Sequence, residues 1–318
     1  MQKIRTFGTY LKDKYKQSVK KIPLAVGGFT CPNIDGVVAK GGCTFCLNDS
    51  FSPNLAKNRD KIFLNLNSTT NPILNKQKAQ VIEQIKADKL DFKKRLGIKK
   101  YIAYFQAFTN TYAPFDTLKE LYDTALNQKD IIGLSIGTRS DSVEDEILEY
   151  LSELSHTKEI WIEFGIQSVF DETLKKINRG HDVANIKEAI KKAKSYGLNV
   201  CGHLIYGLPG EDKKMMLQSA KESFDMGIDS VKFHPLYVVK NTILANEYNR
   251  GEFKPITMDE YIDVLCDSIE IMPKEIIVQR VSAGIDDDSL LAPAWCAESK
   301  NYQMAKIKEA LLRRGYVY

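Results

Sequence analysis

The sequence predicts an α/β protein built around a parallel β-sheet, because short segments rich in β-branched residues alternate with amphipathic helical segments. Six strand–helix units follow one another at a spacing of about 30 residues, the usual length of a unit in which a helix connects two parallel strands. A chain of 318 residues is long enough for one barrel-sized domain or for two ordinary domains.

Each unit is predicted from its own local pattern. The predicted strands are the apolar segments 22–30, 101–108, 130–138, 159–167, 198–210 and 229–238. The predicted helices cover 76–96, 115–126, 170–178, 184–197 and 211–226, and one more follows the third strand. That helix is expected to begin at Ser140 or Asp141, because SDSVEDEI combines capping residues with acidic residues in a first turn.

The last part of the chain, 241–318, is predicted to form an α/β extension. It contains helical patterns near 257–271 and 298–314, with a strand pattern at 275–284 between them. No linker rich in Pro, Ser or Gly separates it from residues 1–240, so we expect it to pack on the same core.

Polar residues and glycines follow each predicted strand. These residues are Cys31, Gln106, Thr109, Asn110, Thr138, Arg139, Gln167, Ser168, Gly207, Glu211 and His234. Because the carboxyl ends of parallel strands meet at one edge of the sheet, this is where α/β enzymes build their active sites. The pattern therefore predicts a site at that edge.

The composition is that of a globular protein without a membrane span. The chain is 43% hydrophobic and 27% charged, and it has neither an apolar run near 18 residues nor a secretory signal. Six cysteines are too few for a disulfide scaffold in a chain of this length, so we expect a reduced, cytoplasmic protein that makes no contact with a membrane.

The net charge of +4 is unevenly distributed. Residues 1–21 hold seven basic side chains and one acidic side chain, and further basic stretches lie at 93–100 and 306–314. Such stretches can bind the phosphates of a nucleic acid, or they can be no more than a solvated surface.

Three of the six cysteines lie within sixteen residues, in CPNIDGVVAKGGCTFC. Cys31, Cys43 and Cys46 could supply three ligands of a structural zinc ion, but the sequence offers only Asp49 as a convenient fourth ligand. Three thiolates would instead suit a 4Fe–4S cluster that leaves one iron open, and a thiol redox pair is a third reading. Gly41 and Gly42 would let the backbone wrap closely around a cluster.

With Phe45 directly before the third cysteine, the segment resembles the radical S-adenosylmethionine (SAM) superfamily. The common spacing in that superfamily is C-x3-C-x2-C, and this chain departs from it with C-x11-C-x2-C. The longer spacing is similar to that of one branch, the bacterial and archaeal proteins related to the catalytic subunit of Elongator. The segments IGTRSD, EFGIQS, INRGHD, HLIYGLPGE and KFHPLYVVKNT match the order expected of that branch.

The resemblance implies a partial (β/α)6 TIM-like barrel, the radical SAM barrel, followed by a C-terminal α/β extension. It further implies that Cys31, Cys43 and Cys46 bind a 4Fe–4S cluster whose open iron chelates SAM. Reductive cleavage of SAM would yield methionine and a 5′-deoxyadenosyl radical, with electrons from a ferredoxin or flavodoxin. The family pattern assigns SAM contacts to Phe45, Gln106, Thr109, Thr138, Arg139, Gln167, Arg179 and Gly207.

Other residues have two readings each. His203 and His234 lie on predicted strands and are candidate catalytic residues, although strand histidines are often only hydrogen-bonded parts of a core. Cys296 is the third catalytic candidate, whereas packing is the simpler role for Cys201 and Cys266. Gly207 can equally be a turn glycine, and Arg179 can cap the preceding helix.

The resemblance also points to a substrate class. The Elongator subunit acts on the wobble uridine of tRNA, so we expect tRNA as the substrate and an altered uridine side chain as the product, formed by a transferase- or lyase-type reaction. The roughly 80 residues after the sixth strand are too few for an acetyltransferase domain. A small-molecule or protein substrate and a zinc-stapled nucleic-acid-binding module are the alternatives.

Overall fold

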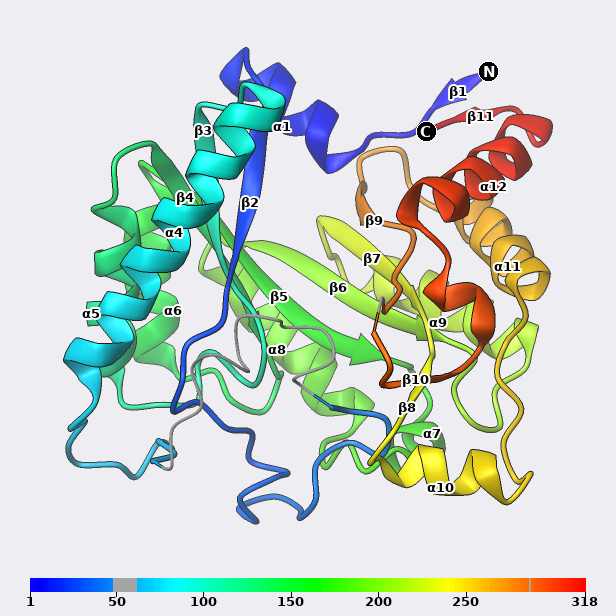
Figure 1. Cartoon of the computed structure of the whole chain (residues 1–318), viewed down its shortest axis with the longest axis horizontal. Coiled ribbons are helices and arrows are strands. Elements are labelled where there is room, and N and C mark those ends of the chain that lie inside the picture. Colours follow the sequence, from blue (N-terminus) through cyan, green and yellow to red (C-terminus); the bar gives the residue numbers. More distant parts are fainter. Residues whose placement is uncertain (48–61, 286) are drawn as a thin grey trace.

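A computed structural model describes residues 1–47, 62–285 and 287–318 of the chain (Figure 1). Its centre is a seven-stranded sheet in the order β2-β3-β4-β5-β6-β7-β9, with every neighbouring pair parallel. These strands are β2 (Val19–Leu24), β3 (Lys100–Phe105), β4 (Ile131–Thr138), β5 (Glu159–Gln167), β6 (Asn199–Tyr206), β7 (Ser230–Pro235) and β9 (Ile277–Arg280). The predicted α/β class and parallel sheet are confirmed.

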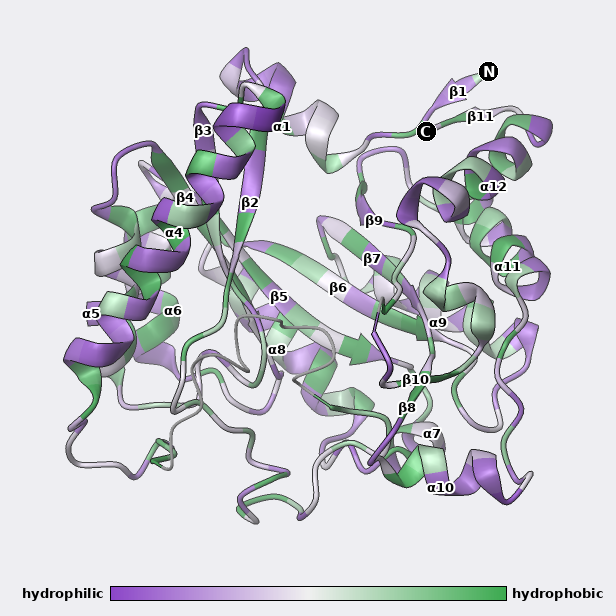
Figure 2. Cartoon of the chain, viewed as in Figure 1, coloured by the Kyte–Doolittle hydropathy of each residue, from purple (hydrophilic) through white to green (hydrophobic). Residues whose placement is uncertain are grey.

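Helices connect the strands and cover the outer face of the curled sheet (Figure 1). They are α4 (Leu74–Leu96), α5 (Phe115–Leu126), α6 (Asp145–Ser155), α7 (Asp171–Lys176), α8 (Val183–Ser195), α9 (Lys213–Asp225) and α11 (Met258–Ile271). Figure 2 shows apolar residues concentrated on the strands and hydrophilic residues along the outer helices. Within the described ranges, no helix has the length and apolar character needed to cross a bilayer.

Residues 241–318 supply one strand of the central sheet and form further elements outside it. The strand pattern at 275–284 forms β9, which pairs with β7 as the seventh strand. Helix α12 (Lys300–Arg313) packs on α11, and β11 (Tyr316–Val317) pairs in parallel with β1 (Gln2–Lys3), so the two ends of the chain lie side by side (Figure 1). The division at residue 240 stays a prediction.

Smaller elements complete the fold. Helix α10 (Ile243–Asn249) follows β8 (Val238–Val239), which pairs with β10 (Leu290–Ala292) as a short antiparallel ribbon. A single turn of 3-10 helix, η1, covers Ala294–Ala297.

The first strand ends earlier than the sequence pattern predicts. Strand β2 leaves the sheet at Leu24, although residues 25–30 remain buried. Three buried glutamines of α4 make the hydrogen bonds that a neighbouring strand would otherwise make. Gln84 accepts from the N–H of Ala25 and donates to the C=O of Ala25. Gln80 accepts from the N–H of Gly27, and Gln77 donates to the C=O of Gly27. Side chains at helical spacing thus satisfy the backbone that leads to Cys31.

The predicted start of the third helix at Ser140 or Asp141 is wrong, because α6 begins at Asp145. The Asp141 carboxylate instead accepts two hydrogen bonds from the Arg139 guanidinium, and the N–H of Ser142 bonds the C=O of Arg139 in a tight turn. Asp141, a residue type that often caps helices, therefore forms an ion pair at the end of β4 here.

The sequence patterns gave no sign of helix α1 (Phe7–Tyr15), which closes the amino-terminal end of the barrel. Its buried residues Phe7 and Leu11 pack on side chains from the inner face of the sheet: Val19, Ile102, Trp161, Cys201 and Ile277. The Trp161 ring meets Phe7 and Tyr10 edge-on at centroid distances of 5.3 and 6.0 Å. We call this layer the floor of the barrel.

Candidate active site at the carboxyl ends of the strands

The cysteine loop lies at the carboxyl ends of the strands, as the sequence predicts. It is fastened to the end of α7, where the Asn178 side chain donates to the C=O groups of Lys40 and Gly42 and the N–H of Thr44 bonds the C=O of Ile177. Asn178 adopts a positive φ of 54°, a conformation that asparagine tolerates better than most residues. The loop is therefore held by contacts that are distant in sequence.

The three thiols lie close enough for the charge of each to affect the others. Cys31 Sγ accepts a hydrogen bond from Thr109 Oγ1 at 3.1 Å, and Cys43 Sγ accepts from Asn33 Nδ2 at 3.3 Å. Burial raises the pKa of Cys31 to about 11, although the Thr109 hydrogen bond acts in the opposite direction. Burial and the two neighbouring thiols raise the pKa of Cys46, so holding three thiolates together requires a positive partner.

The three thiols suit a cluster better than a single ion. Among the described residues, the only group of three metal-ligating side chains with all ligand atoms within 4.8 Å is Glu163, Cys201 and His203, and the cysteine triplet does not form such a group. Three thiolates suit a 4Fe–4S cluster that leaves one iron open, whereas a structural zinc ion needs four ligands.

Two arginines bring positive charge to the thiols. Arg179 Nη1 lies 3.6 Å from Cys43 Sγ, and Nη2 donates to the C=O of Gly165 at 2.8 Å. Arg139 donates to the C=O of Arg179 and pairs with Asp141. Both arginines are buried, yet Nε of Arg179 and Nη1 of Arg139 have no hydrogen-bond partner among the described residues. Buried donors without partners are a feature expected where an anionic group binds.

Gln167 adds an acceptor to the same place. Its backbone has a positive φ of 67°, at a bulge in the pairing of β5 with β6, and its buried Oε1 has no partner in the described part of the chain. Gly165 makes this arrangement possible, because a Cβ there would lie 2.6 Å from both Arg179 Nη2 and Gln167 Nε2. Unpaired donors and an unpaired acceptor thus face the cysteine loop, as a ligand with amino and carboxylate groups requires.

The end of β3 contributes the residues predicted there. Ala107 and Phe108 both have positive φ, and this tight turn brings Thr109 to Cys31 while Gln106 stays half-buried. Thr138 is already paired, since its hydroxyl lies 2.5 Å from that of Thr111. The structure therefore brings Thr109 to Cys31 and Arg179 to Cys43, and it occupies Thr138 and most of Arg139 with protein contacts. The SAM contacts of Gln106 and Gln167 stay predictions.

Phe45 and Gly207 lie farther from the unpaired groups. Phe45 packs against the main hydrophobic core, which anchors the loop between Cys43 and Cys46. Gly207 has φ +87°, and a Cβ there would lie 2.8 Å from Ile256, so packing alone explains the glycine. It lines an open pocket of about 480 Å³ beside the start of α9, and its contact with adenine stays a prediction.

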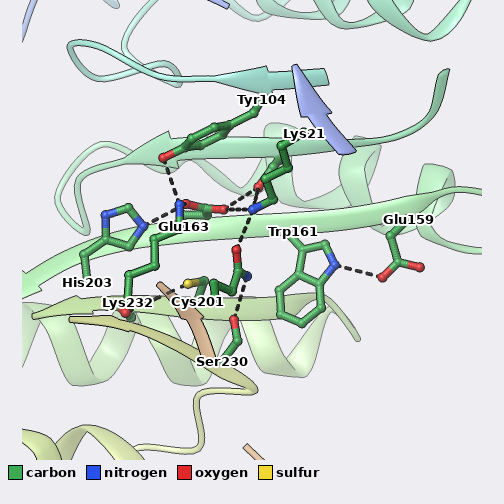
Figure 3. A network of polar contacts seen from close by, with 12 residues as sticks. Lys21, Tyr104, Glu159, Trp161, Glu163, Cys201, His203, Ser230 and Lys232 are labelled. Carbon is green, nitrogen blue, oxygen red and sulfur yellow. Dashed lines mark hydrogen bonds and ion pairs between the residues drawn. The ribbon is translucent and has the colours of Figure 1, made fainter. Parts of the chain in front are cut away.

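A charged network fills the barrel between the floor and the cysteine loop (Figure 3). The Glu163 carboxylate, fully buried on β5, accepts from Lys21, Ser135, Lys232 and His203. Although burial raises its pKa, the charges of Lys21 and Lys232 hold the pKa of Glu163 well below its usual value. Lys21 Nζ also reaches Gln279 Oε1 at 2.6 Å, which joins the two edge strands β2 and β9 across the open side of the sheet.

The three catalytic candidates occupy different environments. His203 Nε2 lies 2.7 Å from Glu163, and its ring centroid lies 5.8 Å from that of His234, whose Nε2 is buried without a partner. Cys296 is only 1% exposed in η1, and burial raises its pKa to about 12, which favours packing. Cys201 and Cys266 are buried in hydrophobic clusters, as expected, and all three catalytic roles stay predictions.

Sequence reasoning missed the residues that position the site. Asn33, Asp141 and Asn178 hold the loop and the arginines, and Lys21, Glu163 and Lys232 form the inner network. A signal for the second group existed, because each is a charged residue within a segment that forms a largely buried strand. The loop-holding residues carry no such signal.

Comparisons with known proteins agree on the kind of protein this site belongs to. The sequence profile of the radical SAM superfamily matches residues 36–222, and that of the radical SAM C-terminal domain matches residues 228–313. The protein YhcC of Escherichia coli (strain K12) is 38% identical over 313 residues, which are 98% of this chain and 93% of YhcC.

Two further proteins are similar over different extents. The tRNA uridine(34) acetyltransferase of Methanocaldococcus infernus is 35% identical over 157 residues, 48% of this chain and 29% of that enzyme. The solved structure of archaeal Methanocaldococcus infernus Elp3, with its N-terminus deleted, superposes with a TM-score of 0.60 at 21% identity. That superposition covers 93% of this chain and 64% of the Elp3 chain, and it shows a shared fold.

Proposed function

Because the chain belongs to the radical SAM superfamily, we propose that it modifies the side chain of the wobble uridine of tRNA. The resemblance inferred from the C-x11-C-x2-C spacing is confirmed: the protein is a radical SAM enzyme that uses a 4Fe–4S cluster and SAM. What we propose beyond this is the substrate: a tRNA uridine, as opposed to a small molecule or a protein.

The residues at the carboxyl ends of the strands fit these cofactors. Cys31, Cys43 and Cys46 would hold three irons, and the unpaired atoms of Gln167 and Arg179 would orient the amino acid part of SAM. When bound, the cluster and SAM together supply a reductive cleavage that gives methionine and a 5′-deoxyadenosyl radical. The protein's own part is to place these groups over the barrel and to exclude water with its buried inner face.

The observation that carries the tRNA substrate is the alignment with the tRNA uridine(34) acetyltransferase over 48% of this chain. Exposed basic residues near the N-terminus support it, since Lys3, Lys12, Lys16 and Lys20 are free of the contacts that occupy Lys14 and Lys21 and are suited to contact phosphates. A tRNA substrate would place the enzyme in the cytoplasm, and the cluster would need a reductant of the ferredoxin or flavodoxin type.

The test is a gene deletion followed by profiling of the modified nucleosides of total tRNA. We expect one wobble uridine derivative to disappear and its precursor to accumulate. A wild-type copy should restore the profile, and a Cys43→Ala copy should not, because it lacks one cluster ligand. An unchanged profile in the deletion strain would remove tRNA uridine as the substrate.

A further inference from the structure

One connected group on the inner face of the barrel, separate from Glu159 at the floor, buries two positive charges against one negative charge. Lys21, Lys232 and Glu163 form one connected group, in which two ammonium groups face a single carboxylate. Burial and the charge of Lys232 lower the pKa of His203 to about 4, so this histidine is neutral at pH 7 and does not balance the group. Burial is costly for unpaired charge, so the excess cation calls for an anion that the described residues do not supply.

The two lysines differ in how fully the protein satisfies them. Lys21 Nζ has three acceptors, one for each of its protons: Glu163, Ser135 and Gln279. Lys232 Nζ has two hydrogen-bond acceptors among the described residues, Glu163 and the Tyr104 hydroxyl at 3.0 Å, although its side chain is only 4% exposed. It also lies 4.2 Å from the centroid of the Tyr104 ring, a contact with the ring face that takes up no oxygen or nitrogen acceptor. No third acceptor for Lys232 exists among the described residues, so one N–H of a buried ammonium is available.

Two side chains next to Lys232, His234 and Arg280, also have nitrogen atoms that form no hydrogen bond with a described residue. His234 follows it by two residues on β7, so the two side chains share a face of the sheet, and the buried His234 Nε2 has no partner among the described residues. Arg280 is the strand partner of Lys232 on β9 and forms no hydrogen bond or ion pair with a described residue. Burial lowers the pKa of both His203 and His234, and the charge of Arg280 acts in the same direction on each.

We propose that Lys232, His234 and Arg280 form a subsite that binds an anionic group of the substrate inside the barrel. The subsite rests on the proposed function, because the substrate of that reaction would carry the anion. A carboxylate or a phosphate would accept from these donors and neutralise the excess cation. The group of the substrate that reacts would then lie between this subsite and the cysteine loop.

A metal ion is a poorer occupant of the same region. Glu163, Cys201 and His203 offer ligand atoms within 4.8 Å of one another. Both carboxylate oxygens of Glu163 are already occupied, however, because Oε1 accepts from Lys21 and Ser135 and Oε2 accepts from Lys232 and His203. Two ammonium groups beside the carboxylate would repel a cation. The charge of the region therefore selects an anion.

The experiment uses the full chain with its cluster reconstituted anaerobically and with SAM present in excess. Acetate and inorganic phosphate are titrated separately by calorimetry, each against chloride at the same ionic strength. We expect saturable binding of one of them, weakened at least about tenfold by Lys232→Met, since a hydrogen bond to a charged group contributes about 1.5–3 kcal/mol. Preference for acetate would assign a carboxylate, and preference for phosphate would assign a phosphate.

Lys21→Met is the matched control, because it removes the same charge from the same network but no available donor. Each variant leaves Glu163 paired with one lysine, so both should fold, and circular dichroism checks this. Arg280→Gln, at an exposed position, is the second variant should Lys232→Met not fold, and it should weaken binding as well. No saturable binding beyond chloride, or equal weakening in the two lysine variants, would overturn the subsite.

The two proposals can fail separately. A changed nucleoside profile in the deletion strain together with no anion binding would reject the subsite and leave the tRNA substrate. Saturable, Lys232-dependent binding together with an unchanged profile would reject the tRNA substrate and leave the subsite.

Discussion

The floor of the barrel and its open end both bury polar groups, but only the floor satisfies them. Glu159, at the floor, accepts hydrogen bonds from Tyr10, Lys14, Tyr15 and Trp161 at 2.7–2.8 Å. At the open end, where the strands finish at the cysteine loop, side chains of two arginines and Gln167 keep buried atoms that have no partner within residues 1–47, 62–285 and 287–318. Buried polar groups that make all their hydrogen bonds hold one conformation, whereas buried polar groups without partners are expected where a ligand binds. The contrast separates the scaffold from the site.

The largest effect is expected from the cysteines at the open end. Replacing Cys31, Cys43 or Cys46 by Ala removes one of three cluster ligands, so the reconstituted protein should lose iron, sulfide and all formation of 5′-deoxyadenosine. Iron and sulfide analysis and chromatography of the reduced reaction measure this. Cys266→Ala, in the hydrophobic core, is the control and should retain the cluster. Retention of a full cluster by Cys31→Ala would refute the ligand assignment.

A smaller effect is expected from Arg179. Arg179→Gln removes a charged donor beside the cysteine loop, so the Kd for SAM should rise about 10- to 100-fold, in line with about 1.5–3 kcal/mol for a hydrogen bond to a charged group. Equilibrium binding to the reconstituted protein measures it. Lys175→Gln removes the same charge from an exposed position on α7 and should leave the Kd unchanged. Equal affinities of the Arg179 variant and the wild type would exclude a SAM contact.

The floor should affect stability and leave SAM binding alone. Glu159→Gln disturbs four hydrogen bonds and should lower the free energy of unfolding at pH 7 by about 1–3 kcal/mol, measured by chemical denaturation. Tyr10→Phe removes one donor and should cost about 0.5–1.5 kcal/mol. A changed Kd for SAM in either variant would show that floor and open end are coupled.

The same carboxylate predicts an acid dependence. Burial raises the pKa of Glu159, but hydrogen bonds from Lys14, Tyr15 and Trp161 hold it below its usual value of 4.5. A lowered folded-state pKa adds stability above 4.5, and this stability is lost as the pH falls through the folded-state value. The difference in unfolding free energy between wild type and Glu159→Gln should therefore shrink below pH 4.5.

The sequence predicted those parts of the molecule that follow from local patterns. The strands and helices were recognisable by periodicity, and Thr109 meets Cys31 because each follows a strand of the same parallel sheet. Contacts between distant segments were not recognisable. Arg139 was expected at SAM or substrate, but Asp141 and the Arg179 carbonyl occupy most of its donors.

The inner network shows the same limit. Lys21, Glu163 and Lys232 are 142 and 69 residues apart along the chain, and only the curl of the sheet brings them together. Helix α1 escaped prediction because its basic residues dominated the pattern, while its function depends on two buried residues, Phe7 and Leu11.

The three glutamines of α4 make the position of one cysteine depend on a helix that is distant in sequence. Residues 25–27, which lead to Cys31, have α4 side chains in place of a second strand, so their path is fixed only while α4 is docked on the sheet. Cys43 and Cys46 are held instead through Asn178, at the end of α7. A displacement of α4 would therefore move one of the three thiols away from the other two.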